Sequence, residues 1–158
     1  MNGSLESALR FIHLTSSGLL AGSLSFGGSA LVPGWEEELP NERKSEAART
    51  LKAFNAIGPT ALATSVALLV ASRSGGVLRR LLDASAAASL AGVLGTTLLG
   101  TVPLNRKISE ARPLDYATEV TASPAKVWAR THGVRTALGV AAFFCAAGAS
   151  VLSTKKKR

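Results

Sequence analysis

Four stretches of this chain are long and apolar enough to cross a lipid bilayer, and they limit its fold more than any other feature. They cover about residues 11–32, 54–72, 84–104 and 133–152. A membrane-spanning helix needs about 20 mostly apolar residues. No charge interrupts the third stretch, "ASAAASLAGVLGTTLLGTV", whereas helices of a soluble bundle carry polar residues at regular helical spacing. The sequence therefore predicts an all-α fold, an integral membrane four-helix bundle, as a single domain over residues 1–158.

Small residues replace larger apolar ones throughout these stretches. The chain is 47% hydrophobic but only 5% aromatic, and Gly18–Gly22 and Ala88–Gly92 each place two small residues four positions apart. Such spacing lets helix backbones approach closely in lipid. The first stretch is longer than the apolar region of about 7 to 15 residues in a secretory signal peptide, so we interpret it as an internal span. The single cysteine, Cys145, excludes a disulfide framework within the chain.

A charged segment separates the first two spans. In "PGWEEELPNERKSEAARTLKAF", Leu39 and Pro40 resemble a turn, and Glu42, Glu46 and Lys52 follow at helical spacing. This pattern is typical of an exposed helix with mixed charges. We expect an additional amphipathic helix between spans 1 and 2. The three successive glutamates lack histidine partners, so we expect no metal site there.

Basic residues beside the spans set the expected orientation. With four spans, the N-terminus, the loop after the second span and the C-terminus share one side, which carries Arg10, Arg79, Arg80 and the final "KKKR". Basic residues in short loops next to spans favour the cytoplasm. We therefore expect a multi-pass protein with both termini cytoplasmic, and its net charge of +8 facing anionic lipid. The sequence contains no basic face with interleaved aromatic residues, so we expect no nucleic-acid partner.

If the chain crosses the membrane four times, the start of the second span, the end of the third and the start of the fourth lie at the same membrane face. The residues of interest at these span ends are Asn55, Pro103, Asn105, Trp128, His132 and Arg135. Trp128, His132 and Arg135 are spaced by four and three positions, so they project from one helical face. Ionisable residues inside a membrane usually face the bundle interior or a wet cavity. Proline inside a helix costs about 3 kcal/mol, so we expect Pro103 to end or kink the third helix and let Asn105 join a polar pocket. Near the opposite face, we expect His13 to bond a neighbouring hydroxyl in a structural role.

Three ordered motifs carry a family resemblance. "FNAIGP" at 54–59, "TVPLNRKI" at 101–108 and the pattern W-x-x-x-H-x-x-RT at 128–136 resemble the anthrone oxygenase-like family of small four-span membrane proteins, also catalogued as a domain of unknown function. The segment "GLLAGSLSFGGSALVPG" at 18–34 is similar to the first span of that family. In the family an asparagine and an extra tryptophan commonly precede the histidine, whereas Arg130 and Thr131 stand there in this chain.

This resemblance implies a cofactor-independent monooxygenase that oxidises a small aromatic polyketide, an anthrone, to a quinone with O2. That reaction needs a base, and His132 is expected to fill this role because histidine titrates near neutral pH. Arg135 and Asn105 would stabilise the enolate oxygen. The substrate would be bound by Asn55, by Trp128 through stacking, and beside Pro103. Neither a cofactor nor a metal is expected.

Other classes of function stay open on the sequence. A non-catalytic membrane protein, such as a subunit of a partner complex, would use the same close helix packing. A small-molecule binder or transporter is a further alternative, although transporters more often contain internal repeats, and none is convincing here. The sequence leaves the oligomeric state open, a homo-oligomer included.

Overall fold

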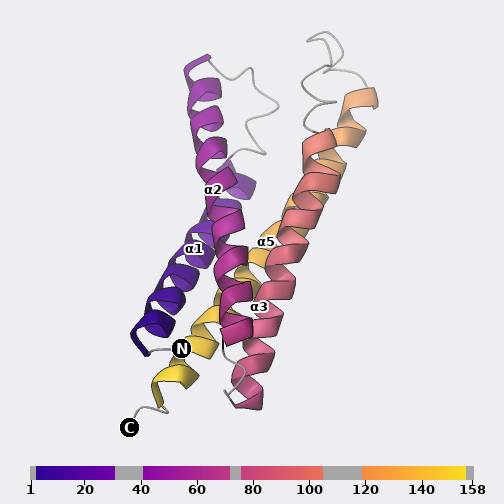
Figure 1. Cartoon of the computed structure of the whole chain (residues 1–158). Helices are drawn as coiled ribbons and strands as arrows, with labels where there is room; N and C mark the ends of the chain where they lie inside the picture. The colour runs from indigo at the N-terminus through magenta and orange to yellow at the C-terminus, as the bar shows by residue number, and fades with distance from the viewer. Residues whose placement is uncertain (1–2, 31–40, 72–75, 105–118, 156–158) are drawn as a thin grey trace.

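The chain forms a bundle of four long helices. The computed structural model describes residues 3–30, 41–71, 76–104 and 119–155 (Figure 1). The helices are α1 (Gly3–Ala30), α2 (Asn41–Ala71), α3 (Val77–Thr96) and α5 (Glu119–Lys155), and the π-helical turn η2 (Thr97–Thr101) follows α3 directly. All regular structure in the described residues is helical, which confirms the predicted all-α fold and is consistent with a helical membrane bundle.

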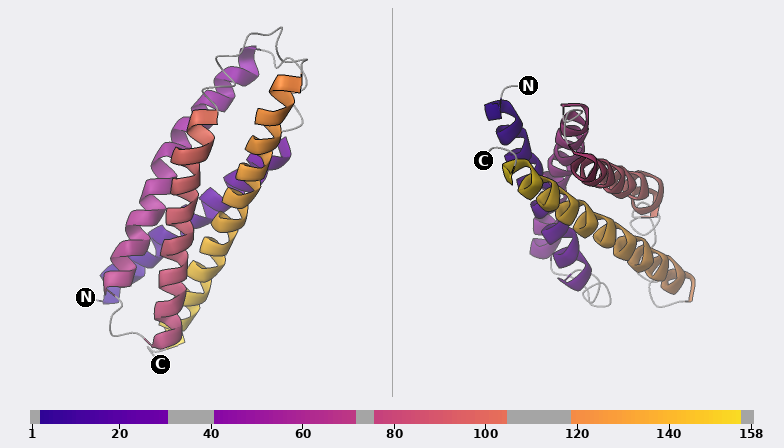
Figure 2. Two further views of the ribbon diagram at one scale, coloured as in Figure 1. Left: turned by 90° about the vertical axis from the view of Figure 1, so that its right-hand side faces the viewer. Right: turned by 90° about the horizontal axis from the view of Figure 1, so that it is seen from below.

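Successive helices run in opposite directions. α1 packs against α2 and α5, and α3 packs against the same two helices, so α1 and α3 lie diagonally opposite each other. The first residues of α1, the start of α3 and the last residues of α5 share one end of the bundle (Figures 1 and 2). We call this the terminal end. The second half of α1, η2 and the first turns of α5 lie toward the opposite end.

The additional helix expected between the first two spans is not a separate element. It is the first part of α2, which begins at Asn41 and runs without interruption to Ala71. The reason is local, because residues 41–57 contain neither glycine nor proline. Pro59 is inside α2 and is exposed, so its ring lies on the outer surface of the bundle.

The bundle exposes large apolar side chains and packs its helices closely at small residues. Ala61 and Ala142 are fully buried beside larger core residues such as Leu24, while Phe11, Leu99 and Phe144 are 70%, 85% and 67% exposed. At Gly139, an added Cβ would lie 2.9 Å from Leu24 Cδ1. Close helix packing at small residues together with an apolar exterior suits packing in lipid.

Two helical stretches pass a test of length and composition for crossing a membrane. They are Val77–Leu104, with a mean hydropathy of 1.5, and Val127–Ser153, with a mean hydropathy of 1.8. Ala56–Ala71 is apolar but shorter. α1 exposes Phe11, but its inward face is polar and includes Arg10 and His13.

A buried ion pair crosses the diagonal of the bundle at the terminal end. Both guanidinium nitrogens of Arg10 on α1 donate to the carboxylate of Asp83 on α3, Nη1 to Oδ1 and Nη2 to Oδ2, each at 3.2 Å. The Asp83 side chain is 1% exposed and that of Arg10 is 7% exposed. This two-point geometry fixes the positions of the two helices better than a single contact would.

Glu6 extends the ion pair to a third helix. Its Oε1 accepts hydrogen bonds from Arg10 Nε at 3.1 Å and from Ser153 Oγ on α5 at 3.2 Å, and it lies 3.2 Å from Arg79 Nη1 on α3. Burial raises the pKa of the Glu6 carboxyl, but the hydrogen bond from Arg10 and the charges of Arg79 and Arg10 outweigh it. The pKa therefore lies below its ordinary value of 4.5. From the sequence, Arg10 and Arg79 were used only to predict the orientation in the membrane. In the structure they form an ion-pair network with Glu6 and Asp83.

Breaking the Arg10–Asp83 pair from one side is expected to destabilise the bundle strongly. Asp83→Asn leaves a buried guanidinium without its carboxylate, and loss of one partner of a buried pair costs about 3–5 kcal/mol. The measurement is denaturant unfolding of the detergent-solubilised protein. The double variant Arg10→Leu/Asp83→Leu is the matched control and should be less destabilised than Asp83→Asn, because it leaves no unpaired charge. Equal losses in the two variants would contradict this account.

Acid is expected to weaken the same end of the bundle. Because folding lowers the pKa of Glu6, its contribution to stability is present above the unfolded pKa of about 4.5 and is lost as pH falls through the folded value. The melting temperature of the wild type should therefore drop below about pH 4. The Glu6→Gln variant should have a lower melting temperature than the wild type at neutral pH, and its melting temperature should fall less on acidification. An equal fall in the melting temperature of both proteins would contradict the assignment to Glu6.

Candidate functional site

A cluster of polar and aromatic side chains lies inside the bundle, away from the terminal end. α5 supplies Trp128, His132 and Arg135, η2 supplies Thr101, and α1 supplies the backbone carbonyl of Leu24. We call these five groups the His132 cluster. The spacing along α5 places its three members on adjacent turns of one face, which is the physical reason that they meet.

His132 is held by the backbone of α1. Its Nε2 lies 2.8 Å from the Leu24 carbonyl oxygen, inside the bundle. A carbonyl can only accept, so Nε2 carries the hydrogen and donates it, and neutral His132 then has its free lone pair on Nδ1. Nδ1 is buried and has no hydrogen-bond partner among the described residues. The structure thus assigns the basic nitrogen of this histidine.

Trp128 fixes the plane of the imidazole. Its ring stacks on that of His132, with centroids 4.8 Å apart and an interplanar angle of 5°. Both residues are buried at 7% exposure. The sequence analysis assigned Trp128 to stacking on a substrate, whereas here one face of the indole stacks on the histidine. The indole therefore holds the imidazole ring of His132 in place.

Arg135 brings a positive charge that no described carboxylate neutralises. Its Nη1 donates to Thr101 Oγ1 at 3.2 Å, and its Nε is buried without a partner in the described part of the chain. The ion pairs in that part all involve other arginines. A guanidinium oriented by a neutral hydroxyl keeps its charge available for an anionic oxygen.

Pro103 is exposed near the end of the described part of the third helix, which runs one residue further, to Leu104. The expected end or kink at Pro103 stays a prediction, because the residues after Leu104 lie outside the described part, but the helix is irregular close to this proline. The irregularity lies just before it, in η2, where the N–H of Val102 bonds the carbonyl of Thr97 five residues earlier. Proline offers no N–H to the carbonyl of Leu99, so the helical hydrogen-bond pattern is already interrupted at this point.

The two asparagines predicted for the pocket stay predictions. Asn105 lies outside the described residues, as do Arg106 and Lys107. Asn55 is in the helical backbone of α2, but its side chain is outside the described part.

His13 is in a separate polar group on the α1–α2 side of the bundle. Its Nδ1 lies 3.4 Å from Ser17 Oγ and 3.5 Å from Thr64 Oγ1. The expected contact with a neighbouring hydroxyl is therefore present.

Two members of the His132 cluster, Thr101 and the Leu24 carbonyl, were not predicted from the sequence. Thr101 is one of many threonines in the spans, and every residue has a backbone carbonyl. Neither group could therefore be identified as part of the cluster from the sequence.

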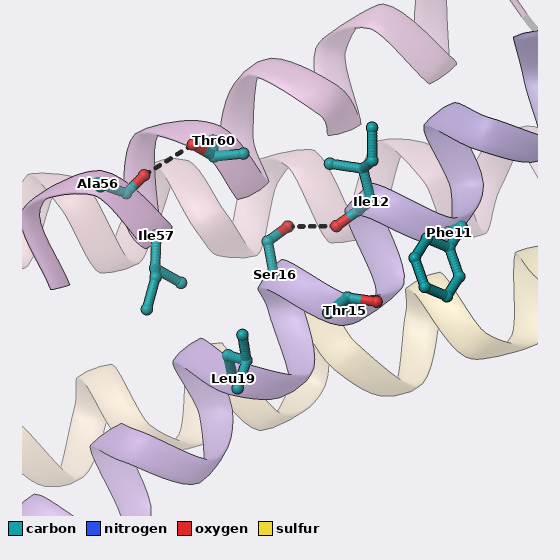
Figure 3. A pocket seen from close by; sticks show the side chains of 8 residues that line it. All are labelled: Phe11, Ile12, Thr15, Ser16, Leu19, Ala56, Ile57 and Thr60. Atoms are coloured by element: carbon teal, nitrogen blue, oxygen red, sulfur yellow. Dashed lines mark hydrogen bonds between the residues drawn. The ribbon is translucent and has the colours of Figure 1, made fainter. Parts of the chain in front are cut away.

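An apolar groove of about 270 Å³ lies between α1 and α2 (Figure 3). Phe11, Leu19 and Ile57 are among the side chains that line it, and no member of the His132 cluster does. The described residues contain no group of three His, Cys, Asp or Glu side chains able to hold a metal ion. The groove and the His132 cluster are therefore distinct features.

Comparison with known proteins gives one match. The family model described as anthrone oxygenase matches residues 48–145, more than half of the chain. The matched region includes Thr101, Trp128, His132 and Arg135, while α1 with its Leu24 carbonyl precedes it. No curated protein and no solved structure matches the chain.

Proposed function

Because the chain belongs to the anthrone oxygenase family, we propose that it is a membrane-embedded monooxygenase that oxidises an anthrone-type aromatic polyketide to a quinone with O2. We propose that the reaction is independent of a cofactor. The observation that carries the proposal is the state of His132, whose Nε2 is tied to the Leu24 carbonyl while Nδ1 is buried and unpartnered among the described residues. A base with one free nitrogen at a fixed position suits proton removal from carbon.

The chemistry follows from the acidity of the substrate. The CH2 group of an anthrone lies between aromatic rings and opposite a carbonyl, so loss of a proton to His132 Nδ1 gives an enolate. Arg135 would stabilise the developing negative charge on the enolate oxygen, because preorganised positive charge acts most strongly in a water-poor site. Desolvation inside the bundle strengthens that interaction.

Oxygen then completes the conversion without another reductant. The enolate passes one electron to O2, and the carbon radical and superoxide combine to form a C–O bond. The resulting peroxide takes the proton held by His132. Loss of the second CH2 proton and cleavage of the O–O bond give the new carbonyl and water. One CH2 and one O2 thus become one C=O and one H2O, so the atoms and electrons balance.

We expect His132→Gln to keep the fold and to lower anthrone turnover by about 100-fold or more, the usual scale for loss of a general base. Glutamine can still donate to the Leu24 carbonyl, but its amide cannot take up a proton at neutral pH. The assay follows substrate loss by the purified protein with and without O2. His13→Gln is the matched control and should be nearly silent. Full activity in His132→Gln, or abolition of wild-type activity by a chelator, would reject this mechanism.

The membrane arrangement is part of the same proposal. We propose that all four helices span the bilayer with both termini in the cytoplasm. Apolar side chains exposed on every helix support this, as at Phe11, Val70, Leu99 and Phe144. The common position of the two termini at one end of the bundle supports it as well.

Reporter fusions test this orientation. Fusions after Arg80 and after Arg158 should report the cytoplasm, because α3 begins and α5 ends at the terminal end (Figure 1) and both fusion points lie beside basic residues. A fusion within residues 36–50 should report the opposite side, and it serves as the internal control. A C-terminal reporter outside the cytoplasm would overturn the proposed orientation.

A further inference from the structure

The hydroxyl of Thr101 is bonded differently from the other threonine hydroxyls of this end of the bundle. Those donate to a carbonyl four residues earlier, as at Thr96, Thr97, Thr131 and Thr136, over 2.6 to 3.0 Å. Thr101 Oγ1 donates to the carbonyl of Thr96, five residues earlier, at 3.5 Å. Only the wider turn of η2 brings that carbonyl within reach of its side chain.

The chemistry of the two partners sets the role of this hydroxyl. Its one hydrogen has an acceptor at 3.5 Å in the π-helical turn, and a guanidinium can only donate, so Oγ1 is the acceptor in the contact with Arg135. The lone pairs of Oγ1 are then free to accept, and Arg135 Nη1 donates to this oxygen at 3.2 Å. Thr101 is 5% exposed, so water competes little for this contact.

The backbone around this contact is also closely packed. A Cβ added at Gly100 would lie 3.2 Å from Thr131 Cγ2 on α5. The lack of a side chain at Gly100 thus lets η2 and α5 approach closely one residue before Thr101. π-helical turns are rare and frequently occur at functional sites.

We propose that η2 makes Thr101 a positioning residue, which orients the Arg135 guanidinium toward the reacting oxygen of the substrate without neutralising its charge. The inference rests on the proposed function for the identity of that oxygen. A carboxylate in place of Thr101 would orient the guanidinium equally well but would cancel the charge that the enolate needs. A neutral hydroxyl oxygen that accepts from the guanidinium avoids that loss.

The test compares three single substitutions in the full chain. Thr101→Val keeps the shape and removes the hydroxyl, and Thr101→Ser keeps the hydroxyl. Thr97→Val removes a hydroxyl from the same turn, and among the described residues that hydroxyl bonds only the Val93 carbonyl. For an anthrone substrate, kcat of Thr101→Val should fall about 10- to 100-fold, the scale of a small misplacement of a catalytic group. KM should change less than kcat. Thr101→Ser and Thr97→Val should stay near the wild type, and all three should melt close to it.

A second readout is independent of turnover. The rate at which phenylglyoxal modifies Arg135, followed by mass spectrometry, should rise in Thr101→Val and stay unchanged in Thr101→Ser and Thr97→Val. Equal modification of Arg135 in the wild type and Thr101→Val, or an equal loss of kcat in Thr97→Val, would overturn the role of Thr101. If the wild type turns over no anthrone, the proposed function fails, and the modification rates alone decide whether Thr101 holds Arg135.

Discussion

The Arg10–Asp83 ion pair directly joins two helices whose backbones are not in contact. α1 and α3 are diagonal neighbours, each packed on α2 and α5, and their large side chains, such as Leu24 and Leu90, meet in the shared core cluster. A bidentate pair at the terminal end sets the distance and the rotation of α1 relative to α3. The His132 cluster depends on that setting at the other end, because its members come from α1, η2 and α5.

Among the described residues, buried arginines are paired with carboxylates at one end of the bundle but not in the His132 cluster. At the terminal end, Arg10 and Arg79 lie beside Glu6 and Asp83, and the described charges cancel within the network. In the His132 cluster, Arg135 is oriented by a hydroxyl and meets no described carboxylate. A paired charge stabilises a fold, whereas a charge left without a counterion is costly unless a ligand uses it. The contrast supports the proposal that the chemistry takes place in the His132 cluster.

Much of the architecture could be predicted, because long apolar stretches and helical spacing act over short ranges of sequence. The helical fold follows from them, and so does the common face of Trp128, His132 and Arg135. One expected element differs in its extent. The charged helix after the first span is continuous with α2, because residues 41–57 contain neither glycine nor proline. The π-helical turn before Pro103 has no counterpart among the predicted elements. The diagonal ion pair joins positions 73 residues apart, and no local pattern reveals such a contact.

The anchor of His132 is a main-chain oxygen, and this affects how the protein can change over evolutionary time. No substitution at position 24 deletes a peptide carbonyl, so replacing the Leu24 side chain would report on core packing and not on the hydrogen bond to His132. α1 precedes the region that the family model covers, yet it supplies this acceptor. The side chain at position 24 is therefore free to change, as far as this acceptor is concerned, so long as the helix keeps its register against α5. An insertion or deletion in α1 would be more harmful to the base than almost any point mutation in the same helix.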